Sequence, residues 1–439
     1  MFDLAVVFSI LIGSIFIGVP VAFALCFTAV TSMLIFLGPV HLIQVVSVVI
    51  SQGTSYNQLI APSFILMAEL LSQGRVAFDI YYVLSKRMQK LKGGLAVAAI
   101  AACTVFAALC GSSPATAASI GRTSVKEMTE LKYDQRFSVG AVAAGGTLGL
   151  LIPPSIQFIM YGIVTETSIV RLFAAGILPG LLLSFMLMVF VIARANMNPS
   201  LVGISQTPKS PESVKHDGAD QETFMQDMIK IVPPLLLIVG ILGSLYSGLA
   251  TPTEVAAVGA MGALFIVVAM RRLNKSLFFN ILRDTTRSSC MIIFTIMSGM
   301  LLSYTVSSLG LAAKFSNLIL SMVTNKWLIV TSCYVIWLIL GCLLDPLSMI
   351  VLTMPFMYPL LTACGFDPIW IGVVSTLCVN IGMLTPPVGL NLFVLSSVCK
   401  IPMKDVIIGT FPYVFVLIAC LIILTIFPGI SLFIPNMLF

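Results

Sequence analysis

The sequence carries very little charge. Only 9% of its 439 residues are Asp, Glu, Lys or Arg, whereas a soluble domain carries roughly a quarter. Hydrophobic residues make up 59%, and the mean hydropathy is +1.09. Many apolar runs reach the roughly 20 residues that a helix needs to cross a bilayer. These figures exclude an ordinary soluble protein and indicate an all-α polytopic membrane protein. The net charge of +6 implies no nucleic-acid partner, because basic residues in such a chain mark its topology.

Several kinds of chemistry are also missing. The two histidines, His41 and His216, are far apart, and no His, Asp and Glu cluster suits a membrane enzyme or a transition metal. No G-x-x-x-x-G-K-S/T loop is present, so we do not expect ATP to drive this chain directly. The ten cysteines form no C-x-x-C pair, which predicts reduced, buried thiols. We therefore expect no enzyme activity and no cofactor. The first residues, M-F-D, lack a basic region, so we expect a retained helix and no cleaved signal.

The apolar runs predict ten membrane spans. Two of them, 137–165 and 369–399, contain a double proline that should break the helix, because proline lacks an N–H and clashes with the preceding turn. The others are 4–18, 20–38, 57–74, 177–195, 231–249, 252–270, 286–308 and 406–427. Two further apolar segments, 95–129 and 327–361, are too long for one span and have a polar or proline-bearing centre. We interpret both as re-entrant hairpins.

The positions of the basic residues support this topology. With the basic loop 75–94 in the cytoplasm and both hairpins re-entrant, only Arg171, Lys314 and Lys326 of the 23 Lys and Arg lie outside. A simple span at 95–129 scatters the basic residues over both sides. The topology places both termini on the outer, periplasmic side. The polar stretch 197–230, rich in Ser, Pro and charge, is predicted to be a cytoplasmic linker.

The two halves of the chain, 1–196 and 231–439, repeat one another. At an ungapped offset of 233 residues, Gly149 aligns with Gly382 and Pro153-Pro154 aligns with Pro386-Pro387. Each half has five full spans, an odd number, so the second half should be inverted relative to the first. Inverted repeats with discontinuous helices are typical of secondary transporters, whose substrate and ion sites lie near the bilayer midplane.

The interrupted segments predict where ions bind. Irregular backbone at membrane depth is tolerated only where it is buried in protein or lines a wet cavity, so tips and breaks should face each other. The tips at 110–116 and 341–348 offer hydroxyls, free carbonyls and one carboxylate, which suit a hard cation such as Na⁺. We predict two Na⁺ sites, the first formed by Gly111, Ser112, Ser113, Thr116, Gly149 and Pro153, and the second by Asp345, Ser348, Gly382, Thr385 and Pro387.

Some of these residues have simpler interpretations. Ser and Thr often serve only to pack membrane helices together, and Asp345 is also placed to cap the returning half-helix. Glu69, Glu166 and Glu254 fall near predicted span ends, which favours solvation at the membrane interface. No Lys or Arg is predicted at mid-membrane, so a bound organic anion would depend on helix N-termini, Na⁺ and neutral donors. The predicted substrate residues are Ser113, Pro154, Ser155, Asn380 and Asn391.

Several motifs resemble one family. The chain is similar to the large, DctM-like membrane subunit of tripartite ATP-independent periplasmic (TRAP) transporters in "GSSPATAASIG", "LGLLIPPSIQFIMYG", "LFAAGILPG", "TPTEVAAVGA" and "IGMLTPPVGLNLFV". The resemblance covers nearly the whole chain, but Lys126 stands where the family pattern leads us to expect a proline. It implies an elevator transporter of the bacterial inner membrane, in which a sodium gradient drives uptake of organic acids such as dicarboxylates or sugar acids. It also implies two partners, a periplasmic binding protein and a small four-helix membrane subunit, which we expect to be a separate polypeptide.

An elevator needs a mobile unit and a fixed one. The hairpins and broken helices, about 95–165 and 327–399, carry every candidate ligand and should move together, while the remaining spans form a scaffold in contact with lipid. Leu42–Ser55 and Ser276–Asp284 resemble arms between the two units, or plain amphipathic connectors. Two alternatives stay open. One is a stand-alone sodium/dicarboxylate symporter without a binding protein, and the other is a channel-like or proton-coupled carrier, in which Asp345 would titrate.

Overall fold

A computed structural model describes residues 2–203, 224–323 and 325–439 of the protein. These residues form helices and connecting loops without a strand, which confirms the all-α fold class. Within these described ranges, eight helices are long and apolar enough to cross a membrane, or nine when the bent pair Tyr56–Gln73 and Val76–Met88 counts as one span. All ten cysteines are free, and most are buried as predicted, although Cys290 is exposed.

The helices of the first half carry both the first hairpin and the first broken helix. They are α1 (Phe2–Phe16), α2 (Val21–Phe36), α3 (Ile43–Gly53), α4 (Ile60–Gln73), α5 (Val76–Met88), α6 (Gly94–Cys110), α7 (Ser113–Glu130), α8 (Gln135–Gly146), α9 (Leu148–Leu151), α10 (Ile156–Thr165) and α11 (Ile169–Met197). Helices α6 and α7 form the first hairpin, and the double proline separates α9 from α10.

The second half also contains a hairpin, α16 (Lys326–Leu343) and α17 (Pro346–Ala363), followed by a broken helix, α18 (Pro368–Gly382) and α19 (Leu390–Cys399). Its other helices are α12 (Phe224–Tyr246), α13 (Pro252–Ala269), α14 (Lys275–Ser308), α15 (Leu311–Met322), α20 (Met403–Ile426) and α21 (Gly429–Leu438). Helix α7 begins at Ser113 and α17 at Pro346, which is 233 positions later, and both contain 18 residues. Helix boundaries therefore recur at the interval found in the sequence.

Equivalent caps start the two broken helices. The Asp134 carboxylate accepts a hydrogen bond from Phe137 N at 2.7 Å, and the Asp367 carboxylate accepts one from Ile369 N at 2.7 Å. A carboxylate at this position satisfies an N–H that has no partner inside the helix and favours the positive end of the helix dipole. These aspartates fix where α8 and α18 begin.

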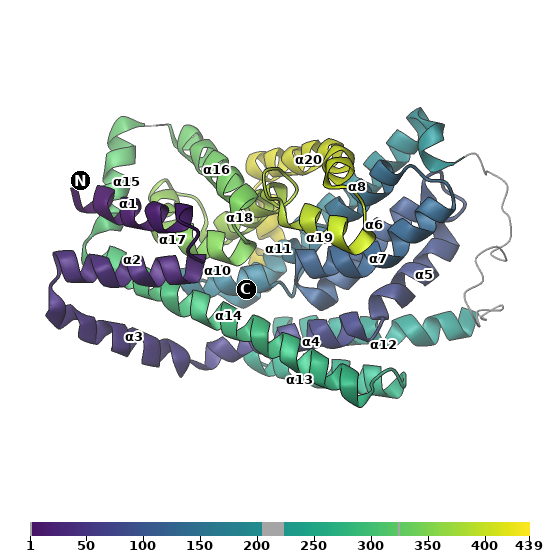
Figure 1. The fold of residues 1–439 in the computed structure, drawn as a ribbon, viewed down its shortest axis with the longest axis horizontal. Coiled ribbons are helices and arrows are strands. Elements are labelled where there is room, and N and C mark those ends of the chain that lie inside the picture. The colour runs from purple at the N-terminus through teal and green to yellow at the C-terminus, as the bar shows by residue number, and fades with distance from the viewer. Residues whose placement is uncertain (1, 204–223, 324) are drawn as a thin grey trace.

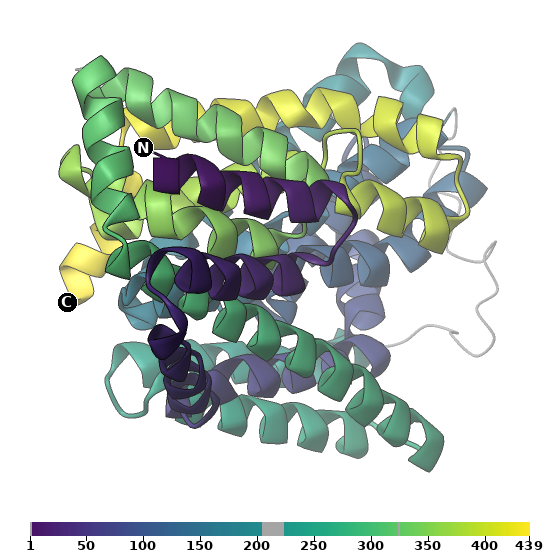
Figure 2. The ribbon, with the colours of Figure 1, turned by 60° about the vertical axis from the view of Figure 1, so that its left-hand side comes forward.

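The helices form three groups (Figure 1). Helices α4, α12, α13 and α14 make a layer along the lower side of the view, and α2 and α3 contact α14. Helices α6, α7 and α8 lie together with α19 and α20 above one end of this layer, and α15 to α18 lie above the other. In Figure 2, α1 and α2 run side by side across the front, while α3 turns away from them.

Burial separates the broken helices from the outer layer. The span Gln135–Thr165 is almost wholly buried, whereas only about a fifth of Met228–Tyr246 is buried. Many exposed side chains of α12 and α13 are apolar, and these include Leu236, Val239 and Phe265, whereas the first turns of α14 expose Lys275 and Arg283. The apolar surface of α12 and α13 suits lipid or another apolar helix. The first broken helix, with its predicted site residues, therefore lies in the protein core.

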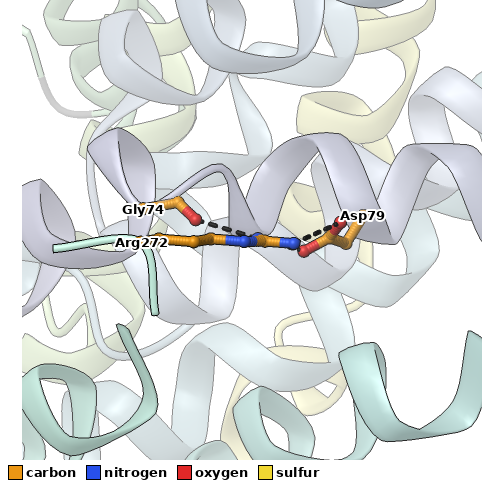
Figure 3. Close-up of polar contacts among 3 residues, drawn as sticks. All are labelled: Gly74, Asp79 and Arg272. Atoms are coloured by element: carbon orange, nitrogen blue, oxygen red, sulfur yellow. Dashed lines mark hydrogen bonds and ion pairs between the residues drawn. The ribbon is translucent and has the colours of Figure 1, made fainter. Parts of the chain in front are cut away.

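The bend between α4 and α5 is held from the other half of the chain (Figure 3). The two helices meet at an angle of 56°. Arg272, from the loop after α13, donates from Nη1 to the Gly74 carbonyl at 3.0 Å and from Nη2 to Asp79 Oδ1 at 3.1 Å. Its Nη1 also donates to Asp79 Oδ2, so the guanidinium forms a bidentate ion pair with the carboxylate.

Several predicted boundaries were wrong. The basic segment 75–94 is mostly helix α5 and not a loop, and the span predicted at 177–195 begins at Ile169. Residues 224–230 of the predicted linker belong to α12, while residues 204–223 lie outside the described residues. Ser276–Asp284 is no separate arm, because it forms the first turns of the continuous 34-residue helix α14. Leu42–Ser55 does contain a short separate helix, α3, in which no residue is buried.

Candidate functional site

The tip of the first hairpin packs directly on the first helix break. Gly111 ends α6 in the left-handed conformation, with φ of +62°, which glycine adopts at no steric cost. Its carbonyl accepts a hydrogen bond from Ile156 N at 3.2 Å. A Cβ atom at Gly111 would lie 2.5 Å from the Pro154 carbonyl oxygen, so no larger residue fits without moving backbone.

The returning helix completes this contact. Pro114 lies in the first turn of α7, where its missing N–H costs nothing. The Thr116 hydroxyl donates to the Ser112 carbonyl at 2.8 Å. A Cβ atom at Gly149 would lie 2.5 Å from that same Ser112 oxygen and 2.9 Å from Thr116 Oγ1. The structure thus brings Gly111, Ser112, Thr116 and Gly149 together, as the sequence predicted.

Two of the predicted substrate residues contact each other. Asn391 Nδ2, on α19, donates to the Ser113 hydroxyl, on α7, at 2.8 Å, and both side chains are fully buried. Asn391 Oδ1 has no hydrogen-bond partner in the part of the chain that the structure describes. Ser155 caps α10, and its hydroxyl donates to the Leu150 carbonyl at 2.5 Å. The first hairpin is therefore tied to the second broken helix through one amide.

The second hairpin packs on the second break in a similar way. A Cβ atom at Gly382 would lie 2.5 Å from the Gly341 carbonyl carbon, and Val388 N donates to the Cys342 carbonyl at 3.1 Å. Asp345 caps α17, since its carboxylate accepts from Ser348 N at 3.0 Å. The capping role considered from the sequence is thus present in the structure. The Thr385 hydroxyl donates back to the Ile381 carbonyl at 2.7 Å.

The two breaks differ in exposure. Every residue from 151 to 160 is buried, including Pro153 and Pro154, whereas Pro386, Pro387 and Val388 are exposed. Within the second predicted Na⁺ set, Gly382 contacts the hairpin and Ser348 is buried beside Asp345, but Pro387 lies on an exposed segment. The same double-proline motif is therefore enclosed in one half and open in the other.

A cavity of 220 Å³ lies between the two hairpin tips and the outer layer. Three of the residues predicted to bind Na⁺ line this cavity, namely Gly111, Ser112 and Asp345. The opposite wall is formed by α4 and α14, and contributes Glu69, Ser72 and Ser288. The predicted substrate residues do not line this cavity. They are buried elsewhere in the protein, and they are Ser113, Pro154, Ser155, Asn380 and Asn391.

Comparison with known proteins identifies the family. The model of the "Tripartite ATP-independent periplasmic transporter, DctM component" matches residues 8–430 of the chain. The chain belongs to the DctM family. The resemblance noted from the sequence is thereby confirmed, and the chain is a TRAP large permease subunit and not an enzyme. The chain therefore belongs to a family of multi-pass membrane permeases, in agreement with its long apolar helices.

Two curated relatives and one solved structure illustrate the match. The chain is 35% identical to the C4-dicarboxylate TRAP transporter large permease protein DctM of Pseudomonas aeruginosa, over 87% of each chain. It is 29% identical to the sialic acid TRAP transporter large permease protein SiaM of Vibrio cholerae, over 97% of each chain. Its fold matches the crystal structure of the Alcanivorax borkumensis YdaH transporter with a TM-score of 0.63, 13% identity and 90% coverage of both chains.

One residue of this DctM subunit was misplaced by sequence reasoning. Glu69 was expected at the membrane interface, but it lines the cavity. The reason is tertiary packing, because α4 lies between α6 of the first hairpin on one side and α13 and α14 on the other. Gln73 Nε2 donates to Glu69 Oε2 at 3.0 Å. Glu254 does sit at an exposed helix start, where it forms a capping box with Thr251.

A buried glutamine was missed altogether. Gln157 Nε2, just after the first break, donates to the Pro346 carbonyl at the second tip, at 3.3 Å. Its Oε1 is buried and without a partner among the described residues, as are both amide atoms of Asn380. Only its place beside a double proline could have drawn attention to Gln157. These amide oxygens are of the kind that hold water or a hard cation in a protein core.

Proposed function

We propose that this DctM subunit is the translocating part of a sodium-driven secondary transporter. It takes up small organic anions delivered by a periplasmic binding protein across the bacterial inner membrane. The observation that supports the proposal best is the cavity, because the tips of both hairpins line it with a serine hydroxyl, a carboxylate and a helix N-terminus. Oxygen ligands suit Na⁺, and α-helix N-termini favour anions. The named substrates of the two relatives, C4-dicarboxylate and sialic acid, are both organic acids.

The organisation of the chain belongs to the same proposal. Residues 1–196 and 231–439 are inverted repeats joined by a cytoplasmic linker at 197–230, and both termini are periplasmic. Residues 95–165 and 327–399 move as one transport unit, and the remaining spans form the scaffold. The exposed apolar side chains of α12 and α13 offer a surface for the small four-helix subunit and for lipid.

Reconstituted uptake tests the sodium coupling. Vesicles that contain the subunit with its partner proteins should accumulate a four-carbon dicarboxylate with an inward Na⁺ gradient, and not with K⁺. Asp345→Ala should raise the Na⁺ concentration for half-maximal uptake, because it removes both the carboxylate and the α17 cap. Glu130→Ala, an exposed carboxylate paired with Lys126 only at 3.8 Å, is the matched control.

The outcomes of this uptake assay separate the candidates. Equal uptake with K⁺ would refute sodium coupling. Sodium-driven uptake that needs no binding protein would instead support the stand-alone symporter. An inward proton gradient that replaces Na⁺ fully would favour a proton-coupled carrier.

A crosslink tests whether the two units move past each other. Ser72 on α4 and Ser119 on α7 have their hydroxyl oxygens 2.7 Å apart, one in each proposed unit. In a cysteine-free background, Ser72→Cys with Ser119→Cys should form a disulfide that stops uptake while Na⁺ still stabilises the protein. Reduction should restore uptake, and each single variant should be insensitive to oxidant. Full uptake in the crosslinked protein would exclude an elevator and favour local gating.

A further inference from the structure

The cavity is acidic on both sides. Asp345 enters it from the start of α17, and Glu69 enters it from α4, on the wall formed by the outer layer. Among the described residues that line it, there is no Lys, Arg or His. The uncharged polar groups are the hydroxyls of Ser72, Ser112 and Ser288, and the rest of the lining is mainly apolar. The charged side chains that a solute would contact in this cavity are therefore the two carboxylates, Glu69 and Asp345.

The two carboxylates have different surroundings. Asp345 Oδ2 already accepts the N–H of Ser348 and lies beside the backbone of the hairpin tip, at the positive end of α17. Glu69 lies on α4 in the wall of the cavity that the outer layer forms. Among the described residues, its carboxylate accepts one hydrogen bond, which Gln73 Nε2 donates to Oε2. Gln73 also reaches Asp284 Oδ2 on α14 at 3.3 Å, so one amide is shared by two carboxylates. This arrangement holds the Glu69 carboxylate in place and leaves its Oε1 available.

An ionised carboxylate can only accept hydrogen bonds. A substrate carboxylate placed beside Glu69 would be repelled, because like charges at short range in a poorly hydrated cavity are costly. A hydroxyl or ammonium group at the same position would donate to Glu69 and gain a charge-assisted hydrogen bond. A cavity with a fixed acceptor rejects a ligand that lacks the matching donor far more strongly than it rejects a change in size.

We propose that Glu69 is a specificity-determining residue that accepts a hydrogen bond from a donor group on the transported acid. The substrate class is then a carboxylic acid that carries a hydroxyl or ammonium group along its chain, and unsubstituted dicarboxylates are poor substrates. The substrate carboxylate lies toward the hairpin tips, and the donor group lies toward α4. This inference rests on the proposed function, since it assumes that the cavity holds the transported solute.

Three acids with the same carbon skeleton test the proposal. Succinate, malate and aspartate differ at one carbon, which carries hydrogen, hydroxyl or ammonium. Their dissociation constants are measured in Na⁺ buffer by thermal stabilisation of the purified subunit with its small-subunit partner. Malate and aspartate should bind about tenfold or more tightly than succinate, as expected for one hydrogen bond to a charged group. This ranking in the wild-type protein tests the proposal without any variant.

Glu69→Gln tests the residue itself. Gln keeps the size and an acceptor oxygen but loses the charge, so the preference for aspartate should fall about tenfold or more and that for malate should fall less. Glu130→Gln, outside the cavity and on an exposed helix face, should keep the wild-type ranking. Equal or tighter binding of succinate, an unchanged ranking in Glu69→Gln, or no binding of any of the three acids would each overturn the proposal.

This experiment can fail separately from the proposed function. Sodium-driven uptake of any organic anion in vesicles, without a preference for the substituted acids, would overturn the role of Glu69 alone. A preserved ranking with uptake that ignores the Na⁺ gradient would overturn sodium coupling and leave the role of Glu69 standing.

Discussion

Removing Arg272 should destabilise the protein far more than removing an exposed arginine. Only 3% of the Asp79 side chain and 24% of the Arg272 side chain are exposed, and Arg272 also donates to the Gly74 carbonyl. Arg272→Ala would leave a buried carboxylate without this cation. Breaking a buried pair in this way costs about 3–5 kcal/mol, and the partial exposure of Arg272 places the expected loss near 3 kcal/mol.

The Arg136–Asp405 pair provides a matched control. Its Arg Nε donates to the carboxylate at 2.8 Å, but 51% and 25% of the two side chains are exposed. Exposed pairs contribute about 0–1 kcal/mol, so Arg136→Ala should lose about 2 kcal/mol less stability than Arg272→Ala. The free energy of unfolding is measured by denaturant titration in mixed micelles, with helix content as the signal.

A double-mutant cycle separates the pair from other effects of the substitution. The cycle compares Asp79→Leu, Arg272→Met and the double variant, which should be more stable than Arg272→Met alone, because apolar side chains of similar size replace a buried pair at little cost. The interaction energy should be about 2 kcal/mol or more, within the range found for contacting residues. If Arg272→Ala loses no more stability than Arg136→Ala, the guanidinium does not hold the α4–α5 bend.

Two further substitutions test the packing around the broken helices. Gly140→Ala should cost about 2 kcal/mol or more of stability, because its Cβ would lie 2.1 Å from the Gly409 carbonyl oxygen, whereas Gly240→Ala meets nothing within 4 Å and should be neutral or stabilising. Asn391→Leu should lower the free energy of unfolding by about 1–3 kcal/mol, because the buried Ser113 hydroxyl loses its donor. Equal stability of the two alanine variants in thermal unfolding, or no loss in the leucine variant, would contradict these expectations.

The local features of the fold were readable from the sequence. Two adjacent prolines in an apolar run interrupt a helix, so the breaks at 153–154 and 386–387 were predicted at the right residues. The hairpin turns at 111–112 and 344–345 followed from Gly-Ser-Ser-Pro and Asp-Pro, because glycine and an acidic cap mark helix ends. The repeat supported both, since each signal occurs twice at one interval.

Long-range features were not readable. Ser276–Asp284 was interpreted as an arm or connector separate from the span 286–308, but both belong to one helix whose 34 residues span about 51 Å, against about 30 Å for a bilayer core. One helix therefore accommodates both the charged turns and the apolar span. The positions of Glu69 and Gln157 depend on the packing of α4 against the first hairpin and on the approach of α10 to the second hairpin. No periodicity or spacing in a single chain carries that information.

The unequal exposure of the two breaks bears on the proposed movement of the transport unit. Both breaks have the same motif and the same hairpin contact, so local sequence does not explain why Pro154 is buried and Pro387 is exposed. The difference must come from what packs against each break.

If the halves are inverted as proposed, one break belongs to each side of the membrane, and the exposed break marks the side to which this conformation is open. Movement of the transport unit against the α4 and α14 wall would then enclose Pro387 and uncover Pro154. Because Glu69 stands on that wall and Asp345 on the moving tip, the same movement would change the distance between the two carboxylates of the cavity. A cation or a donor group between them favours the closed approach, and its absence favours separation. If the transport unit moves as proposed, the two carboxylates give a physical reason for it to move together with a bound cation or donor group.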